Sequence, residues 1–124
     1  MLFRSGAGDH LVSSSSIYGG SFNLFAVTMK RMGVEVTFVD PDCSAEELDA
    51  AFRPNTKAMY GETVANPALT VLDIEKFAAA AHRHGVPLIV DNTFATPINC
   101  RPLDRKSTRL NSSHKVQSRM PSSA

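Results

Sequence analysis

The chain has 124 residues, enough for one small domain, and its 43% hydrophobic and 20% charged residues are typical of a globular protein. No apolar run approaches the ~20 residues of a membrane-spanning helix, and no secretory signal pattern is present, so we expect no membrane partner. Cys43 and Cys100 are not in a C-x-x-C spacing, which favours free thiols in a reducing compartment and a cytoplasmic protein.

Charge is divided unevenly along the chain. Residues 1–103 hold 8 Lys and Arg against 11 Asp and Glu, whereas residues 104–124 hold 5 against 1 and no aromatic residue. At face value the latter segment is a disordered basic tail for a nucleic acid. However, residues 104–114 and 118–124 can be encoded, in order and in frame, by DNA that resembles the two ends of a common short-read sequencing adaptor. We therefore expect residues 104–124 to be a disordered translated artefact, and no nucleic-acid partner.

The first part of the chain predicts two strands joined by a helix. Residues 10–16 are typical of a short strand that runs into a loop of small residues, and residues 34–39 are rich in β-branched residues and predict a strand. An amphipathic helix between them ends at Gly33. Its apolar residues recur at helical spacing: Phe22, Phe25, Met29 and Met32.

A second helix and a third strand follow. Ser44 and Glu47 have the spacing of a capping box, in which each side chain binds the free backbone N–H of the other. The helix that they begin stops before Pro54. Residues 56–63 predict the third strand, and the pair at 66–67 ends it because the residue before a proline is disfavoured in the helical region.

A third helix begins at Asp73 and ends at Gly85. Its apolar positions predict a buried stripe: Ile74, Phe77, Ala78 and Ala81. Residues 88–90 form an apolar run typical of a strand that is buried on both faces of a parallel sheet. The alternation of strands and helices predicts an α/β fold with three layers, a mostly parallel sheet and right-handed crossovers.

Polar residues follow the predicted strands, where ligands of open α/β sheets bind. The sequence places the following residues at these strand ends: Ser13 to Ser16, Tyr18, Glu62, Asn66, Asp91 and Thr93. A flat ring, an amide and a carboxylate together suit a flat, polar, aromatic cofactor. Each residue also has an ordinary alternative, since Tyr18 could be a core aromatic, Asn66 part of a turn and Asp91 a loop cap.

Other kinds of site are disfavoured. His82 and His84 are two positions apart on a helix and face different sides, so the sequence predicts no metal site. No G-x-G-x-x-G fingerprint and no Walker lysine are present. A non-catalytic, Rossmann-like α/β binding module is the alternative from another functional class.

Five motifs occur in a characteristic order: Ala7-Gly-Asp-His-Leu-Val-Ser-Ser, Ile17-Tyr-Gly-Gly, Gly33-Val-Glu-Val-Thr-Phe-Val-Asp40, Glu62-Thr-Val-Ala-Asn-Pro67 and Val90-Asp-Asn-Thr-Phe-Ala-Thr-Pro97. They resemble the middle of the large domain of the Cys/Met-metabolism enzymes that use pyridoxal 5′-phosphate (PLP), over about residues 7–103. The resemblance implies the type I, aspartate-aminotransferase-like fold. Residues 62–69 and 96–102 are most similar to O-acetylhomoserine sulfhydrylases, with cystathionine γ-synthase, cystathionine γ-lyase and methionine γ-lyase as alternatives.

The resemblance also implies roles for single residues. Asp91 would pair with the protonated pyridine nitrogen of PLP and keep the ring an electron sink. Tyr18 would stack on the ring and act catalytically on the leaving group. Asn66 would lie near O3′ of the cofactor and the amino-acid substrate, with Thr93 beside the same site.

Parts of the family's machinery are not found in this sequence. The lysine that binds PLP lies in a Ser-x-Thr-Lys motif downstream of Asp-Asn-Thr in the family, and no such motif occurs here. The phosphate-binding loop and the small C-terminal domain are also missing. We therefore expect residues 1–103 to be an internal fragment of the large domain that is itself inactive, from a parent that is a homotetramer.

Overall fold

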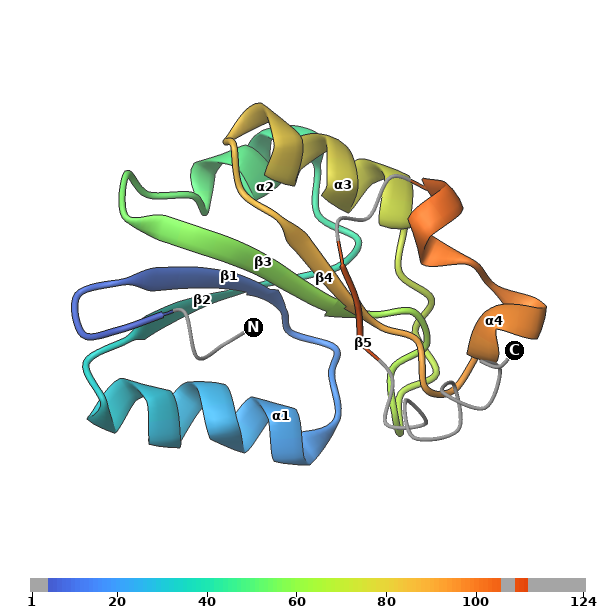
Figure 1. Cartoon of the computed structure of the whole chain (residues 1–124), viewed down its shortest axis with the longest axis horizontal. Coiled ribbons are helices and arrows are strands. Elements are labelled where there is room, and N and C mark those ends of the chain that lie inside the picture. The colour runs from blue at the N-terminus through green and yellow to red at the C-terminus, as the bar shows by residue number, and fades with distance from the viewer. Residues whose placement is uncertain (1–4, 106–108, 112–124) are drawn as a thin grey trace, which may run out of the picture.

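A sheet of five parallel strands in the order β2-β1-β3-β4-β5 forms the centre of the computed structural model (Figure 1). The structure describes residues 5–105 and 109–111. The strands are β1 (His10–Ser14), β2 (Glu35–Val39), β3 (Thr56–Glu62), β4 (Leu88–Asp91) and β5 (Arg109–Asn111).

Helices cover both faces of this sheet. They are α1 (Gly19–Asn23), the π-helical η2 (Leu24–Met29), α2 (Ala45–Ala50), α3 (Ile74–Arg83), α4 (Thr96–Asn99) and the 3₁₀-helical η3 (Pro102–Arg105). In Figure 1 the continuous helix formed by α1 and η2 lies below the sheet, and α2 and α3 lie above it. The predicted three-layer α/β fold with a parallel sheet is therefore confirmed.

Two apolar clusters fill the spaces between the layers. One lies on the α2 and α3 side of the sheet, where Phe77 and Leu88 are fully buried, and the other lies between the sheet and η2, where Phe25 is buried. All four residues of the predicted α3 stripe are buried. Residues 88–90 are also buried, as expected for a strand covered on both faces.

Local hydrogen bonds set the helix ends as the sequence predicts. The capping box is present, because Ser44 Oγ accepts from the Glu47 N–H at 3.2 Å and Glu47 Oε2 accepts from the Ser44 N–H at 2.9 Å. The Asp73 carboxylate caps α3 by accepting from the Lys76 N–H at 3.0 Å. Gly85, which follows α3, has a φ of +69°, a conformation that favours glycine at a helix end.

The first helix differs from the pattern read in its sequence. Phe25 and Met29 are buried, but Phe22 and Met32 are 43% and 63% exposed. The middle of the helix is π-helical, so each turn takes up more residues and a stripe spaced for an α-helix does not stay on one face. Phe22 instead stacks on Phe38 of β2, with ring centroids 4.6 Å apart.

The strand β5 lies within the segment that we expected to be a disordered artefact. It pairs in parallel with β4, Val90 opposite Leu110, and follows the short helix η3. Residues 106–108 and 112–124 lie outside the described residues, and the adaptor origin of the segment stays a prediction. Within the described ranges, no helix is long and apolar enough to cross a membrane.

Candidate functional site

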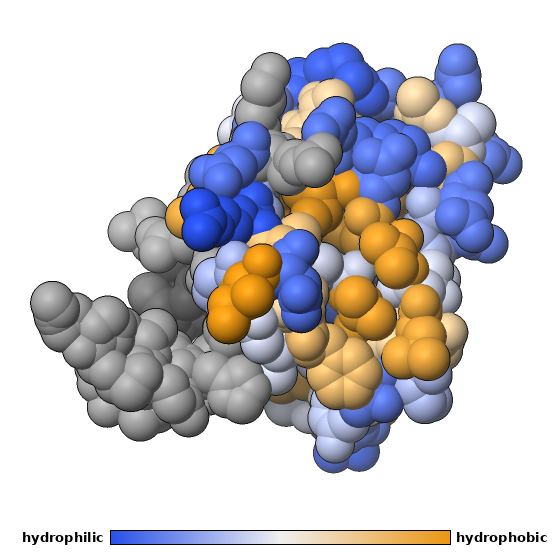
Figure 2. Space-filling model, turned by 90° about the vertical axis from the view of Figure 1, so that its right-hand side faces the viewer, coloured by the Kyte–Doolittle hydropathy of each residue, from blue (hydrophilic) through white to orange (hydrophobic). Residues whose placement is uncertain are grey.

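A cavity of about 290 Å³ lies at the carboxyl ends of β3 and β4. It is lined by Tyr18, Ser21, Glu62, Val64, Asn66, Asp91, Thr93 and Phe94. Figure 2 views the molecule from this end of the sheet and shows apolar side chains gathered on the surface there. The structure thus brings the four predicted cofactor residues into one cavity, whereas the serines at 13–16 are not among its lining residues.

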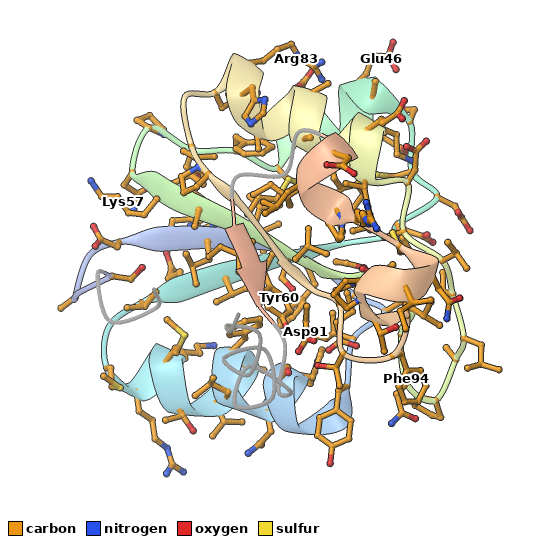
Figure 3. The ribbon with its side chains drawn as sticks, turned by 45° about the vertical axis from the view of Figure 1, so that its right-hand side comes forward. Glu46, Lys57, Tyr60, Arg83, Asp91 and Phe94 are labelled. Carbon is orange, nitrogen blue, oxygen red and sulfur yellow. The ribbon has the colours of Figure 1, made fainter. Side chains whose placement is uncertain are left out.

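Asp91 ends β4 and contributes its carboxylate to the cavity (Figure 3). Its Oδ1 accepts hydrogen bonds from both the backbone N–H and the hydroxyl of Thr93, the first at 2.9 Å. The hydrogen bonds that the structure gives to this carboxylate both end on Oδ1. Among the described residues, Thr93 therefore orients the carboxylate and leaves Oδ2 for a donor in the cavity.

Glu62 ends the neighbouring strand directly opposite Asp91. Its side chain is 7% exposed, and its Oε1 accepts from the backbone N–H of Tyr18 at 2.9 Å. Burial raises the pKa of Glu62, and the nearby charge of Asp91 raises it further. Hydrogen bonds from the backbone of Tyr18 and Asn66 and from the Tyr60 hydroxyl act in the opposite direction and stabilise the carboxylate.

Tyr18 lies at the mouth of the cavity, 55% exposed. Its ring folds over Gly20, where a Cβ atom would come within 2.7 Å of the Tyr18 Cε2. The backbone at Gly20 therefore approaches the Tyr18 ring more closely than a residue with a side chain would allow. Gly19 and Gly20 are not among the glycines with positive φ, because they form the first turn of α1.

Sequence reasoning missed several contributors to the cavity. Ser21, Val64 and Phe94 line it, and the buried Tyr60 interacts with two of the lining residues, Ser21 and Glu62. Burial raises the pKa of the Tyr60 phenol, which therefore acts as a donor. The alternation of side chains along a strand could have indicated Tyr60, because it is two positions before Glu62 and faces the same side of the sheet.

Comparisons with known proteins show the family of this chain. The sequence model of the Cys/Met metabolism PLP-dependent enzyme family matches residues 2–107. The chain belongs to this family. It is 52% identical over 104 residues to the O-acetyl-L-homoserine sulfhydrylase of Corynebacterium glutamicum, covering 84% of this chain and 24% of that protein.

Other members of the Cys/Met-metabolism family are also similar. The cystathionine gamma-lyase of Bacillus subtilis is 48% identical over 103 residues, which cover 83% of this chain and 26% of the lyase. The solved O-acetylhomoserine sulfhydrylase of Wolinella succinogenes superposes with a TM-score of 0.77 at 32% identity, covering 83% of this chain and 29% of that structure. The chain thus spans about a quarter of the length of the curated relatives it matches.

The cavity suits the ring of the family's cofactor. A protonated pyridine nitrogen needs an acceptor with negative charge, which the carboxylate of the lining residue Asp91 provides. The exposed ring of Tyr18 offers a flat apolar face, and Asn66 offers an amide. In the described part of the chain none of the lysines lines the cavity; Lys76 donates instead to the carbonyls of Pro41 and Cys43, both at 2.8 Å.

Proposed function

We propose that this chain forms the ring-binding part of the cofactor site of an O-acetylhomoserine sulfhydrylase, an enzyme that replaces the acetoxy group of O-acetylhomoserine with sulfide or a thiol. The observation that carries the proposal is the Asp91 carboxylate, which lines the cavity and accepts hydrogen bonds from Thr93 at Oδ1. The 52% identity to the C. glutamicum sulfhydrylase supports this reaction within the family.

Each residue then has its own role. Asp91 would accept the N–H of the pyridine ring and keep that nitrogen protonated, Tyr18 would cover one face of the ring and act on the leaving group, and Asn66 would bind polar atoms of the cofactor and substrate. Thr93 holds Asp91 in place. When bound, PLP supplies an electron sink for reactions at the substrate's carbon atoms.

Residues beyond this chain complete the enzyme in this proposal. A lysine from the family's Ser-x-Thr-Lys segment would bind PLP covalently, and the chain by itself would perform no turnover. The complete enzyme acts on small amino-acid substrates in the cytoplasm and assembles as a homotetramer. The apolar surface beside the cavity in Figure 2 supports a contact with further protein at this end of the sheet.

The test is binding of pyridoxamine 5′-phosphate to the purified chain. This compound has the PLP ring but no aldehyde, so it cannot form an imine with exposed lysines. Asp91→Asn removes the charge of the ring acceptor and should weaken binding about tenfold or more, because a charge-assisted hydrogen bond contributes roughly 1.5–3 kcal/mol. Asp42→Asn, the same change at an exposed loop position, is the control.

Two results would count against this function. Equal affinities of the wild type and Asp91→Asn would show that Asp91 does not accept the hydrogen bond from the pyridine N–H. Absence of saturable binding by the folded wild type would show that the cavity does not accept it.

A γ-lyase is the second candidate, favoured by the 48% identity to the B. subtilis enzyme. The two reactions are separated by assays on the complete protein. Release of homocysteine from O-acetylhomoserine and sulfide indicates a sulfhydrylase, whereas release of cysteine from cystathionine indicates a lyase.

A further inference from the structure

The Glu62 carboxylate connects segments of the chain that are far apart in sequence. It accepts from the backbone N–H of Tyr18, 44 positions earlier, at 2.9 Å. The backbone N–H of Asn66, in the loop after β3, and the hydroxyl of Tyr60, on β3 itself, also favour the ionised form of this side chain. One side chain thus holds the backbone of Tyr18 by a hydrogen bond and interacts with Asn66, the other residue proposed to contact the ring and its substituents.

We propose that Glu62 is a positioning residue of the cofactor site, whose carboxylate fixes the backbone of Tyr18 and of Asn66 on either side of Asp91. The identity of the ligand in this inference rests on the proposed function. The contacts of Glu62 do not depend on the proposed function, because they are present in the chain without ligand.

The chemistry of these contacts explains why a carboxylate is suited to this place. Three donors converge on the group, and a carboxylate has about four lone pairs on two oxygens to receive them. Backbone N–H groups bound to an ionised acceptor form charge-assisted hydrogen bonds, which are stronger than those between neutral groups. A glutamine has the same shape, but it has only one oxygen, with two lone pairs, that can accept hydrogen bonds. Its NH₂ group is itself a donor and repels another donor placed beside it.

The position opposite Asp91 adds a second consequence. Glu62 and Asp91 are register partners on adjacent parallel strands, and both line the cavity. The titratable groups that face Glu62 are therefore Asp91 on β4, Tyr60 on β3 and Tyr18 at the start of α1. A cation bound to Asp91 offsets the repulsion between the two carboxylates, so ring binding and ionisation of Glu62 favour each other.

The first test needs no ligand. In a ¹⁵N–¹H NMR pH titration of the full chain, the amides of Tyr18 and Asn66 should shift together with one midpoint above 4.5, because Glu62 titrates above its ordinary pKa. Glu62→Gln should abolish this shared titration, and Asp91→Asn should lower its midpoint. Glu46→Gln, on the exposed surface of α2 and far from Asp91 in Figure 3, should leave it unchanged.

The second test measures binding of pyridoxamine 5′-phosphate. Glu62→Gln should weaken binding about tenfold with no loss of thermal stability, because the glutamine does not carry the buried charge. A purely structural role would instead lower stability and leave the affinity of the folded protein unchanged.

The outcomes separate this inference from the proposed function. A shared titration of the Tyr18 and Asn66 amides that persists in Glu62→Gln overturns the inference, as does wild-type affinity in that variant. If the wild-type chain does not bind the compound at all, the proposed function fails, and the ligand-free titration alone decides whether Glu62 fixes both backbones.

Discussion

His10 makes the stability of this fold sensitive to mild acid. The side chain is fully buried at the start of β1, with Nδ1 2.7 Å from Thr56 Oγ1 and Nε2 2.8 Å from Thr37 Oγ1. Thr56 Oγ1 also accepts from the backbone N–H of Arg53 at 2.8 Å, so its own hydroxyl is assigned as the donor to Nδ1. The neutral ring then donates from Nε2 to Thr37, and every polar atom of the ring is satisfied.

Protonation of His10 would disrupt this arrangement. The added proton on Nδ1 would face a hydroxyl that is itself donating, in a site without water contact. Burial lowers the pKa of His10 below 6.5, and the charge of Arg53 lowers it further, against the opposing effect of Glu35. The folded protein therefore holds a neutral ring at a pH where the unfolded chain is already protonated.

The sign and size of the effect follow from linkage. Above pH 6.5 the ring is neutral in both states, and this contribution to stability is fully present. As the pH falls below 6.5, only the unfolded state takes up the proton, so the free energy of unfolding decreases by at most about 1.4 kcal/mol per pH unit. The upper limit is about 2 kcal/mol at pH 5.

Urea unfolding at pH 7 and pH 5 measures this loss. His10→Gln keeps a donor and an acceptor but does not titrate, so the wild type should lose stability relative to this variant on going to pH 5. The comparison cancels contributions from other groups, such as Glu62, whose raised pKa makes stability fall as the pH rises above 4.5. A difference between the two proteins that is the same at both pH values would refute the reasoning.

A second variant covers the case in which His10→Gln does not fold. Thr37→Val removes the hydroxyl that accepts from Nε2 and leaves a buried donor unpaired. It should lower the free energy of unfolding by about 1–3 kcal/mol at pH 7. Equal stability of Thr37→Val and the wild type would show that the ring does not donate there.

Three further predictions concern the core, the cavity and a helix end. Phe77→Ala should lower the free energy of unfolding in urea by about 3–5 kcal/mol, because Phe77 is fully buried; Phe94→Ala, at a side chain 52% exposed, should cost far less. Gly20→Ala should stabilise α1 by up to about 1 kcal/mol yet weaken pyridoxamine 5′-phosphate binding, since the new Cβ displaces the ring of Tyr18; unchanged affinity would contradict the proposed stacking. Ser44→Ala should lower the melting temperature through a loss of about 1 kcal/mol at the start of α2.

Some features could be predicted because their causes lie within a few residues. The capping box of Ser44 and Glu47 involves groups three positions apart, and the buried stripe of α3 follows from its spacing alone. The apolar run at 88–90 likewise indicates burial on both faces without knowledge of the neighbouring strands. Such patterns are local, so they can be recognised in the sequence without knowledge of the rest of the fold.

Other features depend on partners that are distant in sequence. Nothing near Phe22 or Met32 indicates that η2 is π-helical, and their exposure depends on how this helix meets the sheet. The strand β5 could not be predicted either, because a segment of only three residues is specified by the open edge of β4 rather than by its own pattern.

The sequence by itself determined the order of the first four strands and of the helices between them, most of their ends and the residue types at the carboxyl edge of the sheet. Only the tertiary structure decided that Glu62 lies opposite Asp91 and reaches the backbone of Tyr18. The reason is that strand register and crossover packing, not local propensity, bring these groups together. In the sequence Glu62 is only a polar residue at the end of a strand. In the fold its carboxylate contacts residues on both sides of the site.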